Sequence, residues 1–177
     1  MKAKDLAAAS VIAALYALLV VALPFISFLL WQVRIADALL MMSTVLGWPA
    51  VIGVTLGCFL GNFIAAPWGA VSLTLIDAVL GSIANFVASL AAYIVAYRKD
   101  LRFKIIGAIV EIVLVSLIVG AYLKYLLEWA FNIDMPVLIS IAGVVPGSII
   151  SIGFVGTALT IALEKRIIKR VLQLHHD

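Results

Sequence analysis

Apolar runs recur along the whole sequence, each about 20 residues long, which is the length that a helix needs to cross the hydrocarbon core of a bilayer. This feature decides what the chain can fold into. Of the 177 residues, 66% are hydrophobic and 12% are charged, whereas soluble domains are about half apolar and about a quarter charged. We therefore predict an all-α integral membrane protein without a separate soluble domain.

The runs predict a bundle of six transmembrane helices within a single domain, residues 1–177. Their expected ranges are about 4–27, 33–46, 49–66, 72–97, 103–130 and 137–166. The first run is longer than the apolar part of a signal peptide, so we expect it to remain as the first helix. The second, with about 14 residues, is short for a span at 1.5 Å per residue. We expect that helix to be tilted, shielded or partly extracellular.

Lys and Arg residues gather at three places, and their positions predict the orientation of the chain. Cytoplasmic segments of membrane proteins are rich in these residues, so all three places belong on one side, which requires an even number of spans. Both termini are therefore expected in the cytoplasm of a multi-pass plasma-membrane protein. This topology accounts for the net charge of +3 without a nucleic-acid partner. The basic residues are Lys2 and Lys4 before the first helix, Arg98, Lys99, Arg102 and Lys104 between the fourth and fifth, and Lys165, Arg166, Lys169 and Arg170 in the tail.

Two of the predicted helices carry small residues at every fourth position, a spacing that lets helix backbones approach closely. Each stripe is predicted to be a packing surface. The opposing surface is either another helix of the same bundle or, for the first helix, a partner subunit. The stripes are Ala9, Ala13 and Ala17 on the first helix, and Gly53, Gly57 and Gly61 on the third.

A few polar side chains lie within the predicted helices, near their outer ends except for Asn85, which lies deeper. An ionisable group in hydrocarbon costs about 2.5–3.5 kcal/mol or more on insertion scales, so each requires a partner, water or a function. Asp77, Gly81 and Asn85 follow one another at every fourth position and so share one helix face. The polar residues are Arg34 and Asp37 on the second helix, Asn62 on the third, and Asp77 and Asn85 on the fourth.

These polar residues allow two interpretations. In the first, helices two to four wall a pocket that opens outward, and the sixth helix, kinked at Pro146-Gly147, adds a serine to it. In the second, Arg34 and Asp37 form a structural ion pair at a helix end, which leaves Asp77 and Asn85 unexplained. The serines available to the pocket are Ser140, Ser148 and Ser151.

Two further groups of residues have more than one explanation. Trp31, Trp68 and Trp129 lie near the outer ends of their segments, where they form either an interfacial belt or lids over the pocket. Glu111 lies at a different depth, about 10 Å from the cytoplasmic end of the fifth helix. It either pairs with an inner Lys or Arg or contacts a partner.

Signatures of an enzyme are missing from the sequence. The histidines, His175 and His176, lie in the tail, and the single cysteine, Cys58, lies in an apolar run as a packing residue. Neither type provides a metal or catalytic site within the membrane, and the sequence has no phosphate-binding loop. We expect no metal, no cofactor and no catalysis, so uphill transport would depend on an ion gradient or a partner.

Four stretches, in order, resemble the QueT family, the substrate-binding S components of energy-coupling factor (ECF) vitamin transporters. They are "VRIADAL", a Gly-Trp-Pro turn, "VIGVTLGCFLGNFIA" and "LIDAVLGSIANFVASLAAYIVAY". In the family pattern, an Arg and an acidic residue open the second helix, an Asn ends the third and an Asp lies near the start of the fourth. The matching positions are Arg34, Asp37, Asn62 and Asp77.

The resemblance implies a six-helix subunit that captures a queuosine precursor, a deazaguanine base, from outside. Transport would then require an ECF transmembrane coupling subunit and two cytoplasmic ATPases, and the stripe Ala9, Ala13 and Ala17 would dock on the coupling subunit. A flat base with donors on its edge suits carboxylates, amides and an aromatic face. The candidate substrate-binding residues are Arg34, Asp37, Asn62, Trp68, Asp77, Asn85 and Ser148, with Arg34 orienting Asp37.

Two other functions compete with this hypothesis. An autonomous ion-coupled carrier would use Asp77 and Glu111 as a proton relay. A structural or assembly protein of the membrane would use the polar residues only to tie its helices together.

Overall fold

The computed structural model of the chain describes residues 2–28 and 31–173, with side chains up to residue 166. This part of the chain is built of helices and short connections and has no strand, so the predicted all-α class is confirmed. His175 and His176 lie outside the described residues.

Five helical segments of the described chain are long and apolar enough to cross a membrane. The fifth of them is continuous through three elements and contains Pro146, at which a kink was expected; beyond this proline the segment continues through a π-helical stretch. The segments are α1 (Ala3–Ala22), α4 (Trp48–Ala65), α5 (Val71–Ala96), α6 (Leu101–Phe131), and the run of α7 (Val137–Ser148), η2 (Ile149–Gly156) and α8 (Thr157–Gln173).

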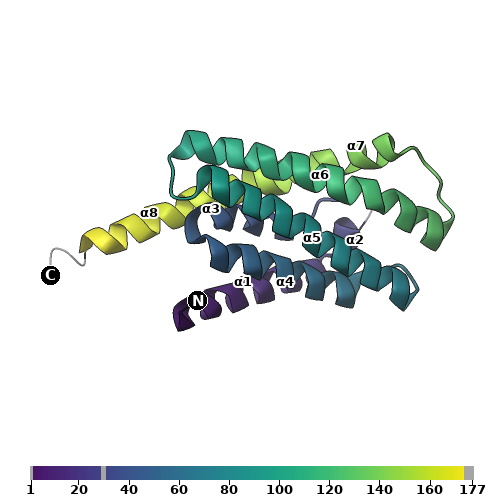
Figure 1. The fold of residues 1–177 in the computed structure, drawn as a ribbon, viewed down its shortest axis with the longest axis horizontal. Helices are drawn as coiled ribbons and strands as arrows, with labels where there is room; N and C mark the ends of the chain where they lie inside the picture. The colour runs from purple at the N-terminus through teal and green to yellow at the C-terminus, as the bar shows by residue number, and fades with distance from the viewer. Residues whose placement is uncertain (1, 29–30, 174–177) are drawn as a thin grey trace.

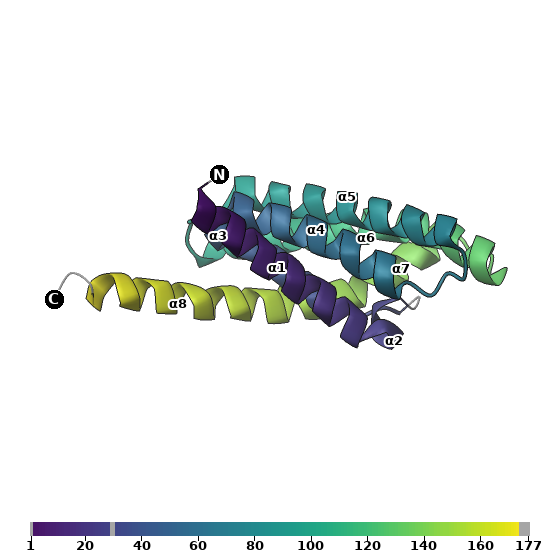
Figure 2. The ribbon, with the colours of Figure 1, turned by 90° about the horizontal axis from the view of Figure 1, so that it is seen from below.

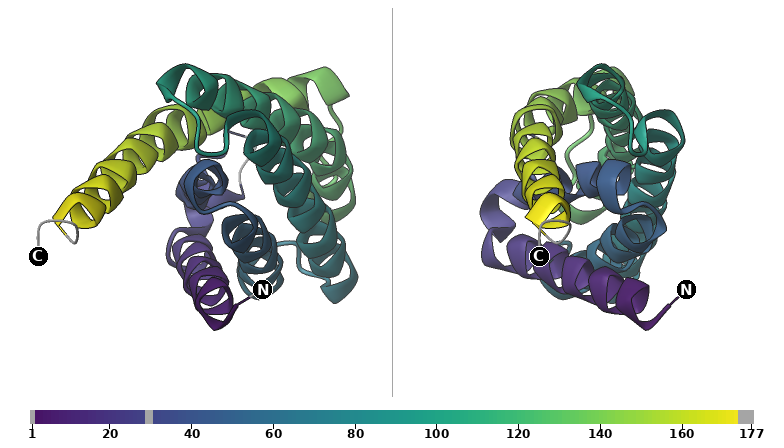
Figure 3. Two further views of the ribbon diagram at one scale, coloured as in Figure 1. Left: turned by 60° about the vertical axis from the view of Figure 1, so that its left-hand side comes forward. Right: turned by 90° about the vertical axis from the view of Figure 1, so that its left-hand side faces the viewer.

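The second predicted helix is a short internal element. It consists of a 3₁₀ helix, η1 (Ile35–Met42), followed by one turn, α3 (Ser43–Leu46). A 3₁₀ helix rises about 2.0 Å per residue instead of about 1.5 Å, so these turns cover about 22 Å rather than about 18 Å. Residues 36–45 are all buried, which makes the segment shielded, one of the three situations expected for it. Figure 3 (right) shows this blue segment enclosed by the long helices.

The short segment carries the chain from one end of the bundle to the other. Near its start, the guanidinium of Arg34 donates to the carbonyl of Ser27, the last residue of α2 (Pro24–Ser27). Near its end, Thr44 accepts from the backbone N–H of Arg98 in the α5–α6 connection, at 2.9 Å. Five segments of the described chain therefore have the length of a typical span, and the short segment runs between them.

The N-terminus, the α5–α6 connection and α8 lie at the same end of the bundle (Figure 1). Lys4, Arg98 and Glu164 line one hollow there, and Glu164 also forms an ion pair with the buried Lys104 of α6. Figure 2 shows α8 running past this end. The basic segments that were expected on one side of the membrane are thus together in space.

The alanine stripe of α1 packs against the glycine stripe of α4. A Cβ built on Gly57 would lie 2.7 Å from the carbonyl oxygen of Ala13, and one on Gly61 would lie 3.3 Å from the Cα of Ala17. Ala9, whose carbonyl faces Gly53, is buried too. The surface opposite the stripe is therefore a helix of the same bundle. The docking of Ala9, Ala13 and Ala17 on a partner subunit stays a prediction, since no partner subunit is present in this structure.

Substituting Gly57 by Ala should destabilise the bundle by about 1–3 kcal/mol, the usual range for overpacking. The added methyl group would meet the Cβ of Tyr16 at 2.6 Å and force α1 away from α4. Gly153→Ala is the matched control, because its nearest neighbour would be the Cδ1 of Ile112 at 3.4 Å. Unfolding in detergent, followed by tryptophan fluorescence, checks this; equal stability of the two variants would contradict the packing.

Candidate functional site

The polar residues predicted to share a site converge inside the bundle, where η1, α4 and α5 meet. Asn62 of α4 donates through its side-chain nitrogen to the carbonyl oxygen of Asp77 on α5, at 3.3 Å. Arg34, at the start of η1, points its Nη1 toward the Sγ of Cys58 on α4, at 3.9 Å. Asp37, Asn62 and Asp77 are each no more than 5% exposed. The helices thus bring together residues that lie far apart in the sequence.

Both side-chain oxygens of Asp77 accept hydrogen bonds from aromatic residues. The indole Nε1 of Trp68 donates to Oδ2 at 2.9 Å, and the hydroxyl of Tyr122 on α6 donates to Oδ1 at 3.0 Å. A buried carboxylate needs such donors, because it has lost its water. Trp68 is therefore part of the polar cluster and not an interfacial belt residue, whereas Trp31 and Trp129 are 67% and 59% exposed.

Asp37 and Arg34 make separate contacts and do not form an ion pair with each other. The hydroxyl of Tyr16 on α1 donates to Oδ1 of Asp37. Arg34 donates through Nη2 to the carbonyl of Ser27 at 3.1 Å, and its guanidinium lies 5.2 Å from the ring centroid of Phe28. The interpretation of the two residues as one structural ion pair is thus wrong.

Gly81 of α5 leaves the space that the side chains of the polar cluster occupy. A Cβ on Gly81 would meet Nδ2 of Asn62 at 2.7 Å, the hydroxyl of Tyr122 at 3.2 Å and Sγ of Cys58 at 3.3 Å. Only a residue without a side chain allows α4 and α6 to present these groups over α5 at this point. Gly81 lies between Asp77 and Asn85 on one face, as the spacing predicted.

A cavity of about 10 Å³ lies beside Arg34 and Asp37. Ser148 of α7 lines it, as was expected of one of the three serines, whereas Ser151 donates to the carbonyl of Gly147 instead. This volume is close to the minimum that holds one water molecule. A ring-sized ligand therefore enters only if the surrounding side chains move. The complete lining is Gln32, Arg34, Asp37, Val115, Val119, Val144 and Ser148.

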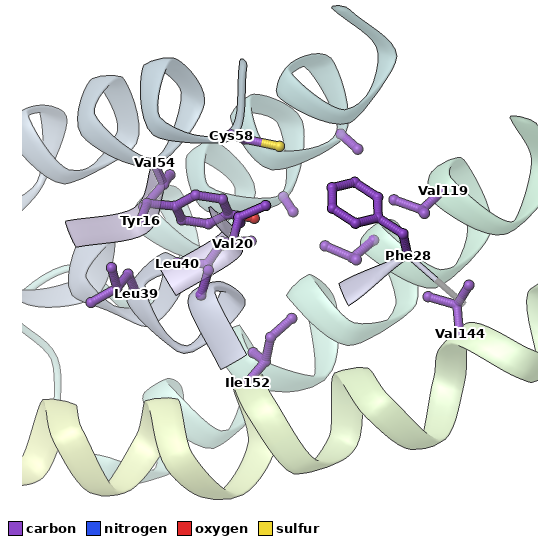
Figure 4. Close-up of a cluster of buried hydrophobic side chains, with 14 of the residues drawn as sticks. Tyr16, Val20, Phe28, Leu39, Leu40, Val54, Cys58, Val119, Val144 and Ile152 are labelled. Carbon is purple, nitrogen blue, oxygen red and sulfur yellow. The ribbon is translucent and has the colours of Figure 1, made fainter. Parts of the chain in front are cut away.

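A much larger apolar hollow, of about 450 Å³, lies next to the polar cluster. Phe28 connects the two, because it lines the hollow and also faces the guanidinium of Arg34. Its ring packs edge-on against Trp68, with centroids 6.4 Å apart, and Trp68 packs against Phe131 at 5.9 Å. Figure 4 shows Phe28 within the core, with Val119 and Val144 beside it. Ligand pockets typically have about 300–1,000 Å³, so the hollow has the size of one.

Two buried polar residues lie apart from these contacts. Asn85 continues the polar face of α5, but its Nδ2 has no hydrogen-bond partner and it does not bond to the cluster. Glu111 of α6 is fully buried and accepts from the hydroxyl of Ser43 at 3.5 Å, while its Oε2 has no partner. Among the described residues Glu111 forms no ion pair, so it does not pair with an inner Lys or Arg as one interpretation required.

Sequence reasoning missed the two phenols that serve the aspartates. Tyr16 and Tyr122 lie within long apolar runs, where an aromatic residue reads as hydrophobic. Their hydroxyl groups were the available signal, because a buried Tyr usually has a hydrogen-bond partner. The described residues contain no group of His, Cys, Asp or Glu that could hold a metal ion.

Comparison with known proteins identifies one related family. The model of the family described as QueT transporter matches residues 6–165. This match spans nearly the whole chain, including α6 and the α7–α8 segment that the sequence motifs did not cover. No curated protein and no solved structure matches the chain.

Replacing Tyr122 by Phe should lower the free energy of unfolding by about 1.5–3 kcal/mol, because Oδ1 of the buried Asp77 loses a donor. Tyr125→Phe is the matched control on the same helix. Tyr125 is 46% exposed, so its loss should stay within about 0.5 kcal/mol. Chemical unfolding of both variants in detergent measures the difference, and similar midpoints would argue against the Tyr122–Asp77 bond.

Proposed function

The chain belongs to the QueT transporter family, and from this we propose that it is the substrate-binding S component of an ECF transporter. It is a transport protein of the membrane. In the proposed role it binds a queuosine precursor, a deazaguanine base, on the outer side of the membrane. Partner subunits then drive the translocation of the bound base. The observation that carries the proposal is the buried cluster around Asp37 and Asp77 next to an aromatic hollow.

In the proposed topology the protein crosses the plasma membrane six times, and both of its termini lie in the cytoplasm. Support comes from the clustering of Lys4, Arg98 and the α8 end of the bundle, since cytoplasmic segments are rich in basic residues. The short η1–α3 segment provides the sixth pass, shielded from lipid by the long helices. The aromatic hollow, lined by Phe25, Phe28 and Phe131, then faces outward.

The chemistry of the cluster suits a deazaguanine base. Such a base is flat and carries several N–H donors on one edge, which two carboxylates can accept. In the closed cluster, Tyr16 and Tyr122 donate to those carboxylates. On binding, the N–H groups of the base would take over this role while the ring of Phe28 covers one of its faces. The other proposed contacts with the base come from Asn62, Arg34 and Ser148. Asn85 would extend the binding surface along α5.

The substitutions Asp37→Asn and Asp77→Asn should each weaken binding of 7-deazaguanine at least tenfold, about 1.4 kcal/mol. Each keeps the shape of the side chain but replaces an accepting oxygen by a donor. Asp134→Asn, on the exposed α6–α7 connection, is the control and should bind normally. Isothermal titration of the purified, folded variants measures this. Wild-type affinity in both site variants would refute the proposed site.

Uptake should depend on partner subunits, because the chain has no phosphate-binding loop. Vesicles that contain this protein alone should bind 7-deazaguanine without accumulating it. Adding an ECF coupling subunit and two ATPases should give uptake that requires ATP. Accumulation without ATPases, abolished by an uncoupler, would instead identify an autonomous ion-coupled carrier.

A further inference from the structure

Gln32 lies between α2 and η1, and its side chain is 5% exposed. Its amide nitrogen Nε2 has no hydrogen-bond partner, and neither has the Nε of Arg34. Both residues line the cavity of about 10 Å³ that Asp37 and Ser148 also line. Two residues that each carry a buried donor without an acceptor therefore line the same small cavity.

Such an arrangement is costly for a folded protein unless it serves a purpose, because a buried donor loses its hydrogen bonds to water. Buried unpaired groups are uncommon in native structures and require an explanation, such as a bound water or a ligand. The two donors belong to residues on either side of Val33, and both residues border this cavity. An acceptor bound in the cavity is therefore the candidate partner of both donors.

The backbone that carries Gln32 is held in place from both sides. The N–H of Val33 donates to the carbonyl of Ile26 at 2.8 Å. On the other side, the carbonyl of Gln32 occupies the space that a Cβ at position 147 would need, so Gly147 allows this segment to lie directly on α7. The position of the Gln32 backbone thus follows from its packing against α7.

We propose that Gln32 is a specificity-determining residue that binds, together with Arg34, a carbonyl oxygen of the ligand, while Asp37 accepts the N–H beside that carbonyl. A carbonyl oxygen has two lone pairs and can accept from both donors, whereas a ring nitrogen has one. The site therefore binds the cyclic amide edge of guanine-type bases in preference to the amidine edge of adenine-type bases. This inference rests on the proposed function.

The test compares 7-deazaguanine with 7-deazaadenine on the purified full-length protein by isothermal titration. Wild-type protein should prefer 7-deazaguanine at least a hundredfold. Gln32→Leu, which removes the amide, and Gln32→Glu, which replaces the donor by an acceptor, should each weaken 7-deazaguanine binding at least tenfold and reduce the preference. Ser116→Ala is the control, since Ser116 is also buried and unpaired but does not line the cavity.

The possible results of this titration separately test the role of Gln32, the recognition of the cyclic amide edge and the proposed substrate. If wild-type protein binds 7-deazaguanine and both Gln32 variants keep its affinity and preference, the role of Gln32 is refuted while the proposed function stands. Equal wild-type affinity for the two bases refutes the cyclic amide edge. If the wild type binds neither base, the proposed substrate fails and the inference fails with it. Thermal unfolding in detergent must give similar midpoints for all variants, because a change in fold would also lower binding.

Discussion

The burial of charged groups inside a membrane-embedded bundle is the constraint on which this structure depends. A carboxylate in such a place is stable only if it finds hydrogen-bond donors. Asp77 receives an indole and a phenol, and Asp37 receives a phenol. These donors come from α1, α6 and the α4–α5 connection, so the need to satisfy two aspartates fixes how several helices meet. Gly81 then becomes necessary, because the donors and Asn62 crowd the space above it.

Much of this fold could be predicted from the sequence, for a simple reason. The thickness of a bilayer fixes the length of an apolar helix, so α1, α4, α5 and α6 lie close to their expected ranges. The second helix was expected to be short, but its 3₁₀ geometry was not predicted. This geometry depends on the distance that the segment must cover between the two ends of the bundle, which the sequence does not show. Small-residue spacing indicated that α1 packs closely; it could not indicate on what, since a stripe fits a neighbour and a partner equally well.

The candidate site shows a similar division. Arg34, Asp37, Asn62 and Asp77 stand out in a sequence because charge and amides are rare in apolar runs, and these four do converge. How they pair could not be predicted: Arg34 and Asp37 are three residues apart, yet each finds a different partner across the bundle. Tyr16 escapes detection because its hydrogen bond becomes visible only in three dimensions.

Tyr16 has two roles that are joined in one side chain. Its Cβ lies against Gly57, in the contact between α1 and α4, and its hydroxyl reaches Asp37. Any event that alters the α1–α4 contact must therefore act on Asp37. Thermodynamic linkage makes this relation reciprocal: the free energy with which a ligand at Asp37 changes the α1–α4 contact equals that with which the contact changes ligand affinity. The α1–α4 contact is thus connected to the carboxylate of Asp37 through the side chain of Tyr16.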